Sequence, residues 1–415
     1  MIGTARSYAI GQLTPRAVLR PETPEAVAEA LRKAGAEGQA VVPWGAGTKQ
    51  GFGNAPRAYD VALDLTALDQ VLEYEPADLV LTAQAGIPLA ILQRRLAEAG
   101  QFLALDPPYG ERATLGGTLA TNASGPSRLL YGTARDLVLG LRVATPDGAL
   151  VKSGGKVVKN VVGYDLNKMH LGALGTLGVM VEVTLKVHPL PRAEATVGAA
   201  FDDPAAAHQV AGRLFRSVLY PRAVEVVRAA LPGFDGPAGR LWVLTWAAGS
   251  PATVERQVRD ATAWCGEAGS VEVVRLDGER HAAVWSDVRE FGRTLPSEAA
   301  LVKLTCLPTE IAGLLQDVDA ALVPTGAPTA EVVVHVGSGV LYVAVPAPTA
   351  ASLEQLVRAA TARGGSVVIE SAPEALKATL DVWGPVRDDV RLMRALKEQF
   401  DPQGTLNPGR YVGGI

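Results

Sequence analysis

Four stretches rich in glycine and other small residues constrain this chain more than any other feature of its sequence. They are residues 43–51, 114–125, 131–136 taken together with 159–165, and 172–179. Small residues allow main-chain N–H groups to converge on one point, and converging amides bind phosphate without many cations. The stretches therefore predict a main-chain site for a large ligand that carries a diphosphate.

The first stretch, Pro-Trp-Gly-Ala-Gly-Thr-Lys-Gln-Gly, is not a Rossmann fingerprint. Its glycine spacing differs, and no apolar-periodic helix begins inside it. NAD is therefore disfavoured. Each stretch on its own could also be a plain turn or a tightly packed structural crossing, and only their combination favours a cofactor site.

The charge pattern excludes several classes of function. The 415 residues carry a net charge of −4, and no run of Lys or Arg could follow a phosphate backbone, so a nucleic-acid partner is not expected. No secretory signal or transmembrane span is visible, and a cytoplasmic location is expected. Two distant cysteines, Cys265 and Cys306, lack metal-ligand spacing and are expected to be buried thiols.

The ordered stretches, together with Leu406-Asn407-Pro408-Gly409-Arg410, resemble the vanillyl-alcohol oxidase and p-cresol methylhydroxylase family of flavoproteins over nearly the whole chain. The closest resemblance is to the E-type FAD-binding subunits of glycolate oxidases. It implies an α+β fold: a two-lobed FAD-binding domain of the p-cresol methylhydroxylase (PCMH) type at 1–191 and a cap domain with an antiparallel sheet and helices at 192–370. A segment at 371–415 would return to the flavin.

The resemblance also implies which residues hold FAD. Residues 44–51 would wrap the pyrophosphate through main-chain amides. Asp106, Pro108 and residues 114–125 would line the flavin and diphosphate. Two valines would face the adenine, and Asn407 would reach towards the isoalloxazine ring. The implied set is Trp44, Gly45, Ala46, Gly47, Thr48, Lys49, Gly51, Asp106, Pro108, Thr114, Gly116, Gly117, Ala120, Thr121, Asn122, Gly125, Val179, Val181 and Asn407.

The cofactor is expected to be non-covalent. Many relatives carry a histidine in the first loop that bonds to the flavin, whereas this sequence has Thr48 there. No cysteine occurs in the N-terminal domain. A dissociable FAD follows from these two observations.

The cap domain departs from the pattern of the catalytic relatives. Those relatives oxidise 2-hydroxy acids with a carboxylate-binding arginine, a base and often a divalent metal, which they hold in His-x-Gly-Asp-Gly-Asn-x-His and Gly-Glu-His-Gly segments. Here the first segment keeps His335 but ends in Tyr342, and the second keeps Glu370 without its histidine. One imidazole and one carboxylate are too few ligands for a catalytic metal, so no metal site is expected. Arg289 and Arg410 are the candidate cations for the substrate carboxylate.

These residues leave more than one function open. The chain is interpreted as the FAD-binding oxidoreductase subunit of a glycolate oxidase-like complex, with a D-type FAD subunit and an iron–sulfur subunit as partners and a small 2-hydroxy acid as substrate. Alternatively, it is a non-catalytic flavin subunit that supports the D-type chain, or an autonomous glycolate or D-lactate dehydrogenase that uses Arg289, His335, Glu370 and Arg410.

Overall fold

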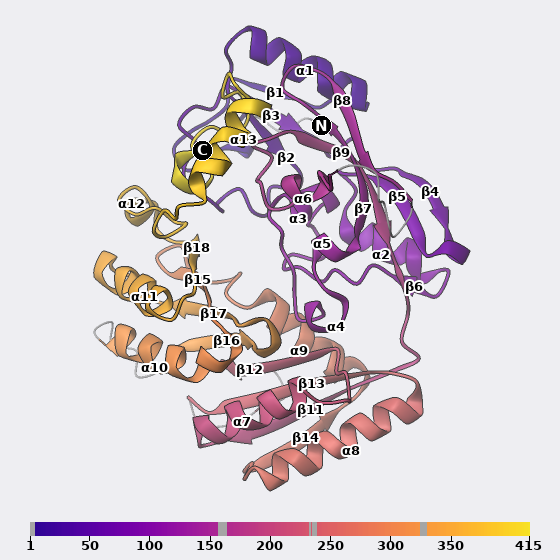
Figure 1. Cartoon of the computed structure of the whole chain (residues 1–415), viewed down its shortest axis with the longest axis vertical. Helices are drawn as coiled ribbons and strands as arrows, with labels where there is room; N and C mark the ends of the chain where they lie inside the picture. The colour runs from indigo at the N-terminus through magenta and orange to yellow at the C-terminus, as the bar shows by residue number, and fades with distance from the viewer. Residues whose placement is uncertain (1–4, 157–163, 232–233, 235–238, 324–329) are drawn as a thin grey trace. The chain divides into compact units, whose positions relative to one another are not determined.

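A computed structural model describes residues 5–156, 164–231, 234, 239–323 and 330–415. The glycine-rich stretch at 159–165 therefore lies mostly outside the described residues. The chain forms two compact units (Figure 1). Unit 1 contains Met1–Ser124, Gly132–Leu190 and Pro385–Ile415, and unit 2 contains Gly125–Tyr131 and Pro191–Gly384.

The first lobe of unit 1 is a small parallel sheet with one helix. Strands β1 (Ala17–Leu19), β3 (Val61–Asp64) and β2 (Val41–Trp44) lie in that order, after a short 3-10 turn η1 (Ala5–Tyr8). Helix α1 (Pro24–Ala36) begins at the cap residue Thr23, whose hydroxyl accepts from the N–H of Ala26. Its apolar face packs on β2 and β3.

The second lobe is a five-stranded antiparallel sheet covered by short helices. The strand order is β4-β5-β9-β7-β8, and a two-stranded pair joins β6 to β10. The elements of this lobe are β4 (Val71–Glu75), η2 (Pro76–Asp78), β5 (Val80–Gln84), α2 (Leu89–Ala97), β6 (Gln101–Phe102), α3 (Leu115–Ala120), α5 (Ala134–Leu137), β7 (Val138–Ala144), β8 (Leu150–Gly154), α6 (Asn167–His170), β9 (Val179–Lys186) and β10 (His188–Pro189).

The C-terminal segment belongs to unit 1, although unit 2 separates the two in sequence. Helix α13 (Val390–Phe400) leads into an irregular stretch that ends in the 3-10 turn η6 (Val412–Gly414). Leu406 forms a parallel bridge with Val41, and the N–H of Asn407 donates to the carbonyl of Val41 at 2.9 Å. This segment extends the small sheet beside the first glycine-rich loop.

Unit 2 is built on an eight-stranded antiparallel sheet with the order β14-β11-β13-β12-β16-β17-β15-β18. Its elements are α4 (Arg128–Tyr131), β11 (Ala193–Phe201), α7 (Pro204–Phe215), β12 (Ala223–Arg228), β13 (Leu241–Gly249), α8 (Pro251–Glu267), β14 (Glu272–Leu276), α9 (Gly278–Glu290), β15 (Ala300–Thr305), η3 (Pro308–Glu310), α10 (Ile311–Leu322), β16 (Glu331–His335), η5 (Val336–Ser338), β17 (Val340–Val345), α11 (Ala350–Ala362), β18 (Val367–Ser371) and α12 (Glu374–Lys377).

The two faces of this sheet have different coverings. On one face, helices α7, α8, α10 and α11 pack over a large apolar core (Figure 1). On the other face, α9 buries Trp285 and its neighbours against β11 to β13. Because successive side chains of a strand point to opposite faces of the sheet, each strand contributes residues to both of these layers.

Residues 125–131 join unit 2 through a buried arginine. The guanidinium of Arg222 donates to Oγ of Ser127 and to a carboxylate oxygen of Glu194, both at 2.8 Å, and its Cζ lies 4.0 Å from the centre of the Trp246 ring. These contacts explain why Gly125, predicted among the cofactor residues, lies in unit 2.

The α+β class and the antiparallel cap sheet with helices agree with the prediction. The C-terminal segment was expected to begin at 371, whereas unit 1 resumes at Pro385. Strand β18 and helix α12 belong to unit 2 because β18 pairs with β15 at the edge of the large sheet. In the described part of the chain, no helix is both long and apolar enough to cross a membrane.

Candidate functional site: a cofactor cleft and a buried polar row

A cleft in unit 1 runs along the glycine-rich loops. Two cavities of about 510 and 460 Å³, open mouths included, share six lining residues and are therefore neighbouring parts of one cleft. Their size is that of a typical ligand or cofactor site. The shared residues are Pro43, Gly45, Thr114, Gly117, Ala120 and Leu174.

The two ends of the cleft differ in chemistry. The first cavity is lined by the loop from Gly45 to Gln50 and by Thr121, Asn407 and Arg410. The second is lined mainly by small and apolar residues, which include Leu65, Ala85, Gly175, Gly178, Val179 and Met180. A ligand with a polar diphosphate and a flat apolar ring fits this division.

Main-chain amides are available at the polar end. The N–H groups of Gly45, Ala46, Gly47 and Thr48 donate to no acceptor within the described part of the chain. Gly47 has φ = 71°, which favours glycine and turns the loop back on itself. Consecutive unsatisfied amides of this kind form an anion-binding nest.

Close contacts with neighbouring side chains explain why the walls of the cleft need glycine. A Cβ on Gly45 would lie 2.1 Å from Oγ1 of Thr114, and one on Gly116 would lie 2.9 Å from Cβ of Ala85. Thr114 also caps helix α3, since its hydroxyl accepts from the N–H of Gly117 at 3.3 Å. Any larger residue at Gly45 would push the phosphate loop away from α3.

Asn407 presents an unsatisfied acceptor to the cleft. Its Nδ2 donates to the carbonyl of Leu174 at 2.5 Å, while its Oδ1 is buried with no hydrogen-bond partner among the described residues. A buried unsatisfied oxygen is costly, so the position favours a ligand that donates a hydrogen bond. The flavin ring of FAD offers such a donor.

Arg410 holds the loop in position. Its guanidinium donates to Oε1 and to the carbonyl of Gln50, both at 2.6 Å, and to the carbonyl of Phe52 at 2.8 Å. Burial lowers the pKa of Arg410 to about 10, which leaves it charged at neutral pH. Arg410 as a whole residue is 4% exposed, so this cation stabilises the loop. Its predicted role as a substrate cation remains a proposal.

Most of the predicted cofactor residues line the cleft. The ones that do are Trp44, Gly45, Ala46, Gly47, Thr48, Lys49, Thr114, Gly116, Gly117, Ala120, Thr121, Val179 and Asn407. Six others do not line either cavity, namely Gly51, Asp106, Pro108, Asn122, Gly125 and Val181, and of these Val181 belongs to the apolar core beneath the sheet. Sequence reasoning missed Phe52, Leu65 and Ala85, whose place in the cleft depends on folding.

A row of polar side chains crosses unit 2. Glu225 on β12, His335 on β16, Tyr342 on β17, Lys303 on β15 and Glu370 on β18 come from five consecutive strands of the sheet. Their apolar neighbours in sequence belong to the core on the opposite face, so the alternation of each strand brings all five to the face that α9 partly covers.

Strand register brings the members of this row together. Glu225 pairs directly with His335, and Lys303 pairs directly with Tyr342. Nδ1 of His335 lies 2.7 Å from Oε2 of Glu225, and the His335 and Tyr342 rings meet edge to face at 5.6 Å. Burial, and after it the Glu370 carboxylate, raises the pKa of the Tyr342 phenol.

Arg293 completes the row. Its Nη1 donates to Oε2 of Glu370 at 2.5 Å, and its guanidinium lies 5.8 Å from the centre of the Tyr342 ring. The side chains of Arg293 and Glu370 are 9% and 6% exposed, so the pair is buried and charge-assisted.

Lys303 contributes a second cation. No hydrogen bond or ion pair joins its ammonium to the described residues. Desolvation lowers its pKa, Glu370 opposes that shift, and Arg128 and Arg293 add to it. A cation without a partner, next to two arginines, is suited to binding a small carboxylate.

Of the predicted catalytic residues, His335 and Glu370 lie in this row, each against a charged partner that sequence reasoning missed. Arg289 lies in the last turn of α9, four residues before Arg293, and is half-buried. Arg410 lies in unit 1. Neither Glu225 nor Lys303 is near these residues in sequence, and only strand register could have identified them.

Comparison with known proteins places the chain in a family. Residues 15–154 match the FAD binding domain family, and residues 190–411 match the C-terminal domain of FAD linked oxidases. The glycolate oxidase subunit GlcD of Bacillus subtilis is 26% identical over 96% of this chain and 89% of its own length. D-2-hydroxyglutarate dehydrogenase of Xanthomonas citri is 30% identical over 95% of this chain and 89% of its own length.

Similarity to an E-type subunit is stronger but covers less of the chain. GlcE of Escherichia coli is 46% identical over 132 residues, which are 32% of this chain and 38% of that protein. A solved structure of alkyldihydroxyacetonephosphate synthase superposes with a TM-score of 0.73 at 20% identity, over 96% of this chain and 78% of that one, and confirms the predicted fold. The chain therefore belongs to the family of FAD-linked oxidases, related to glycolate oxidases and D-lactate dehydrogenases, and its cofactor is FAD.

Proposed function

We propose that this chain is the FAD-binding subunit of a glycolate oxidase-like complex that oxidises a small 2-hydroxy acid, and that it takes up or relays electrons through a dissociable FAD. Its partners in the proposal are a D-type FAD subunit and an iron–sulfur subunit. Bound FAD would accept a hydride from the α-carbon or electrons from the partner flavin. Similarity to both GlcD and GlcE supports the proposal.

One observation carries this assignment. Oxidation of a 2-hydroxy acid needs a base for the hydroxyl proton as the hydride leaves. One of the two candidate bases in unit 2, the Glu370 carboxylate, is already held by the guanidinium of Arg293. The cleft in unit 1, by contrast, keeps its amides and its close glycine contacts. An intact cofactor site in unit 1, together with a candidate base in unit 2 that already forms an ion pair, favours a relaying subunit.

A second candidate is an autonomous 2-hydroxy-acid dehydrogenase. Lys303 and Arg293 favour it, because two cations on one sheet face could hold a substrate carboxylate. Arg289 is a further candidate for this contact. In this candidate His335 would accept the hydroxyl proton, since a carboxylate lies beside its Nδ1.

Anaerobic flavin reduction separates the two candidates. The purified FAD-loaded protein is mixed with glycolate and with D-lactate while the flavin absorbance is followed. The proposal expects the flavin to stay oxidised until a D-type partner is added. Rapid bleaching of the isolated chain would establish the autonomous enzyme. An oxidised flavin even after the partner is added would support a non-catalytic flavin subunit.

A further inference from the structure

Catalytic relatives with complete cap-domain motifs use a divalent metal. The contacts of the corresponding residues in this chain show whether they could hold one. The residues at the ligand positions are His335, Tyr342 and Glu370. Within the residues that the structure describes, no three His, Cys, Asp or Glu side chains gather closely enough to hold a metal ion. The contacts of each residue show what replaces the metal.

Glu370 is already engaged by a cation. Its Oε2 accepts from Nη1 of Arg293 at 2.5 Å, and both side chains are almost fully buried. A guanidinium stays protonated at any physiological pH, so this positive charge is permanent. A metal ion that approached Glu370 would have to displace it and would leave a buried arginine without its carboxylate, which is strongly unfavourable.

His335 alone still has the environment of a metal ligand. A carboxylate beside Nδ1 of an imidazole, like Glu225 at 2.7 Å, commonly orients the other ring nitrogen towards a metal. The His335 ring also meets the phenol ring of Tyr342 edge to face, with 5.6 Å between the ring centres. A neutral phenol is a weak ligand for zinc, which prefers imidazole, thiolate and carboxylate.

The charge around these residues also opposes a metal. Lys303 pairs with Tyr342 across the strands, and the fields of Arg293 and Arg128 both act on its ammonium. Bringing a divalent cation to this face would add repulsion from three cationic side chains in a poorly screened environment.

We propose that Arg293 takes the place of the divalent metal in this chain: its guanidinium, held by Glu370 and lying against Tyr342, supplies the fixed positive charge on this sheet face, and unit 2 neither binds nor needs a metal there. The inference rests on the proposed function only in taking a small anion as the ligand of this sheet face. The metal content of the protein does not depend on which of the two candidate functions is correct.

Metal binding tests the proposal directly. The FAD-loaded wild-type protein is titrated with Zn²⁺ and Mn²⁺ by calorimetry, and its metal content is measured by mass spectrometry after purification without chelators. We expect no stoichiometric metal and no saturable binding. The variant Arg293→Ala/Tyr342→His frees Glu370 and adds a second imidazole, so we expect it to bind zinc at least about 100-fold more tightly than the wild type and to gain thermal stability with zinc.

Arg358→Ala provides the matched control, since Arg358 is an exposed arginine on α11 of unit 2. It should behave like the wild type in both measurements. One equivalent of metal on the wild-type protein, lost in Glu370→Gln, would overturn the proposal. A double variant that binds zinc no better than the wild type would overturn it as well, because Arg293 would then not be what excludes the metal.

These measurements need neither substrate nor turnover. If the wild-type protein binds metal while its flavin is reduced only after the D-type partner is added, the metal inference alone is wrong. If the flavin stays oxidised under all conditions while the metal titrations behave as expected, the proposed function alone is wrong.

Discussion

Gly45 approaches Thr114 so closely that a Cβ atom on the glycine would meet Oγ1 of the threonine at 2.1 Å. Real side chains do not tolerate that distance, and Thr114 cannot withdraw without losing its cap of α3. The variant Gly45→Ala should therefore displace the phosphate loop and weaken FAD binding at least about tenfold, or about 1.4 kcal/mol. The ratio of flavin to protein absorbance after gel filtration measures the loss.

Gly51→Ala is the control for that variant. It lies in the same loop, but a Cβ at Gly51 would meet nothing within 4 Å. It should retain FAD at the wild-type level. Equal loss of flavin in the two variants would show that the contact with Thr114 is not what matters.

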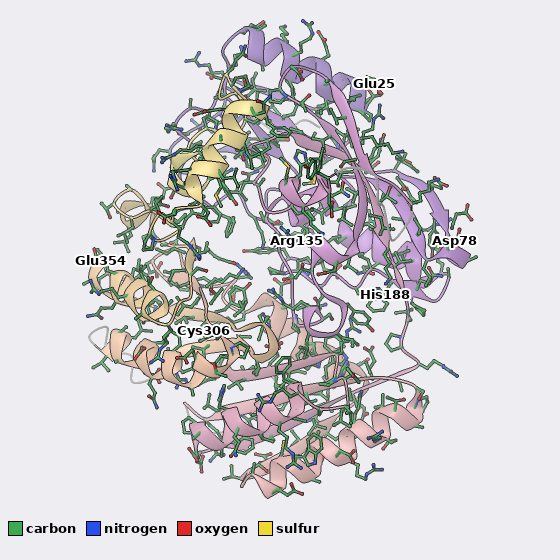
Figure 2. The ribbon with its side chains drawn as sticks, in the orientation of Figure 1. Glu25, Asp78, Arg135, His188, Cys306 and Glu354 are labelled. Carbon is green, nitrogen blue, oxygen red and sulfur yellow. The ribbon has the colours of Figure 1, made fainter. Side chains whose placement is uncertain are left out.

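Arg410 should be needed to hold the glycine-rich loop at Gln50 and Phe52 in its folded conformation. The variant Arg410→Ala leaves the carbonyls of Gln50 and Phe52 without their charged donor, and we expect a loss of about 2–4 kcal/mol in stability together with weaker flavin binding. Thermal unfolding followed by flavin fluorescence measures both. Arg135→Ala, at an exposed arginine of the same unit (Figure 2), should change neither. A fully stable, flavin-loaded Arg410→Ala protein would contradict this role.

Protonation of His170 at acid pH should destabilise unit 1. Burial lowers the pKa of this histidine from 6.5 to about 4, and its ring packs against Phe400 at 6.3 Å. Because the folded state resists the proton that the unfolded state accepts, stability is complete above pH 6.5 and falls as the pH drops towards 4. The total loss from this group is about 3 kcal/mol.

The flavin reports this change, since a Cβ at Gly178 in the cleft wall would lie 3.4 Å from Cε1 of His170. His170→Leu should lose less stability and release less flavin between pH 6.5 and 4 than the wild type. Parallel pH profiles of the two proteins would rule out His170 as the cause.

The cofactor should be dissociable. Thr48 lines the cleft where many relatives carry a flavin-linked histidine, and within the described residues no histidine or cysteine lines either cavity. Both cysteines lie in unit 2, where Cys306 follows β15 (Figure 2). Acid precipitation should leave the yellow colour in the supernatant. A yellow pellet would demonstrate a covalent bond.

Lys303 should dominate anion binding by unit 2. Its ammonium has no partner within the described residues, so Lys303→Met removes a cation without breaking an ion pair. We expect D-lactate or oxalate to bind at least about tenfold more weakly, as measured by calorimetry. Lys168→Met, at an exposed lysine of unit 1, is the control. Unchanged anion affinity in Lys303→Met would remove this residue from the proposed site.

Local sequence signals account for several elements of unit 1, and most of the residues predicted to hold FAD line the cleft. The stretch from Thr114 carries its own cap and small residues, and the apolar alternation of residues 80–84 reappears as β5. Such signals lie within a few neighbouring residues, where propensity and capping decide the conformation.

The polar row in unit 2 could not be predicted in the same way. Glu225 and His335 are far apart in sequence, and they meet only because β12 pairs with β16 in one particular register. A shift of one residue would send either side chain to the opposite face. Arg293 likewise reaches Glu370 through a fold-dependent contact, so the sequence alone left both candidate bases without partners.

The return of the C-terminal segment to unit 1 has a consequence for how the protein is made. Leu406 pairs with Val41, and Arg410 clamps the loop at Gln50, yet the whole of unit 2 is translated between these two halves. A ribosome that synthesises the chain from its N-terminus has therefore finished unit 2 before the cradle for FAD can close. We therefore expect flavin loading to be completed only after translation, because a nascent chain that stalls before residue 406 lacks the C-terminal part of the cofactor site.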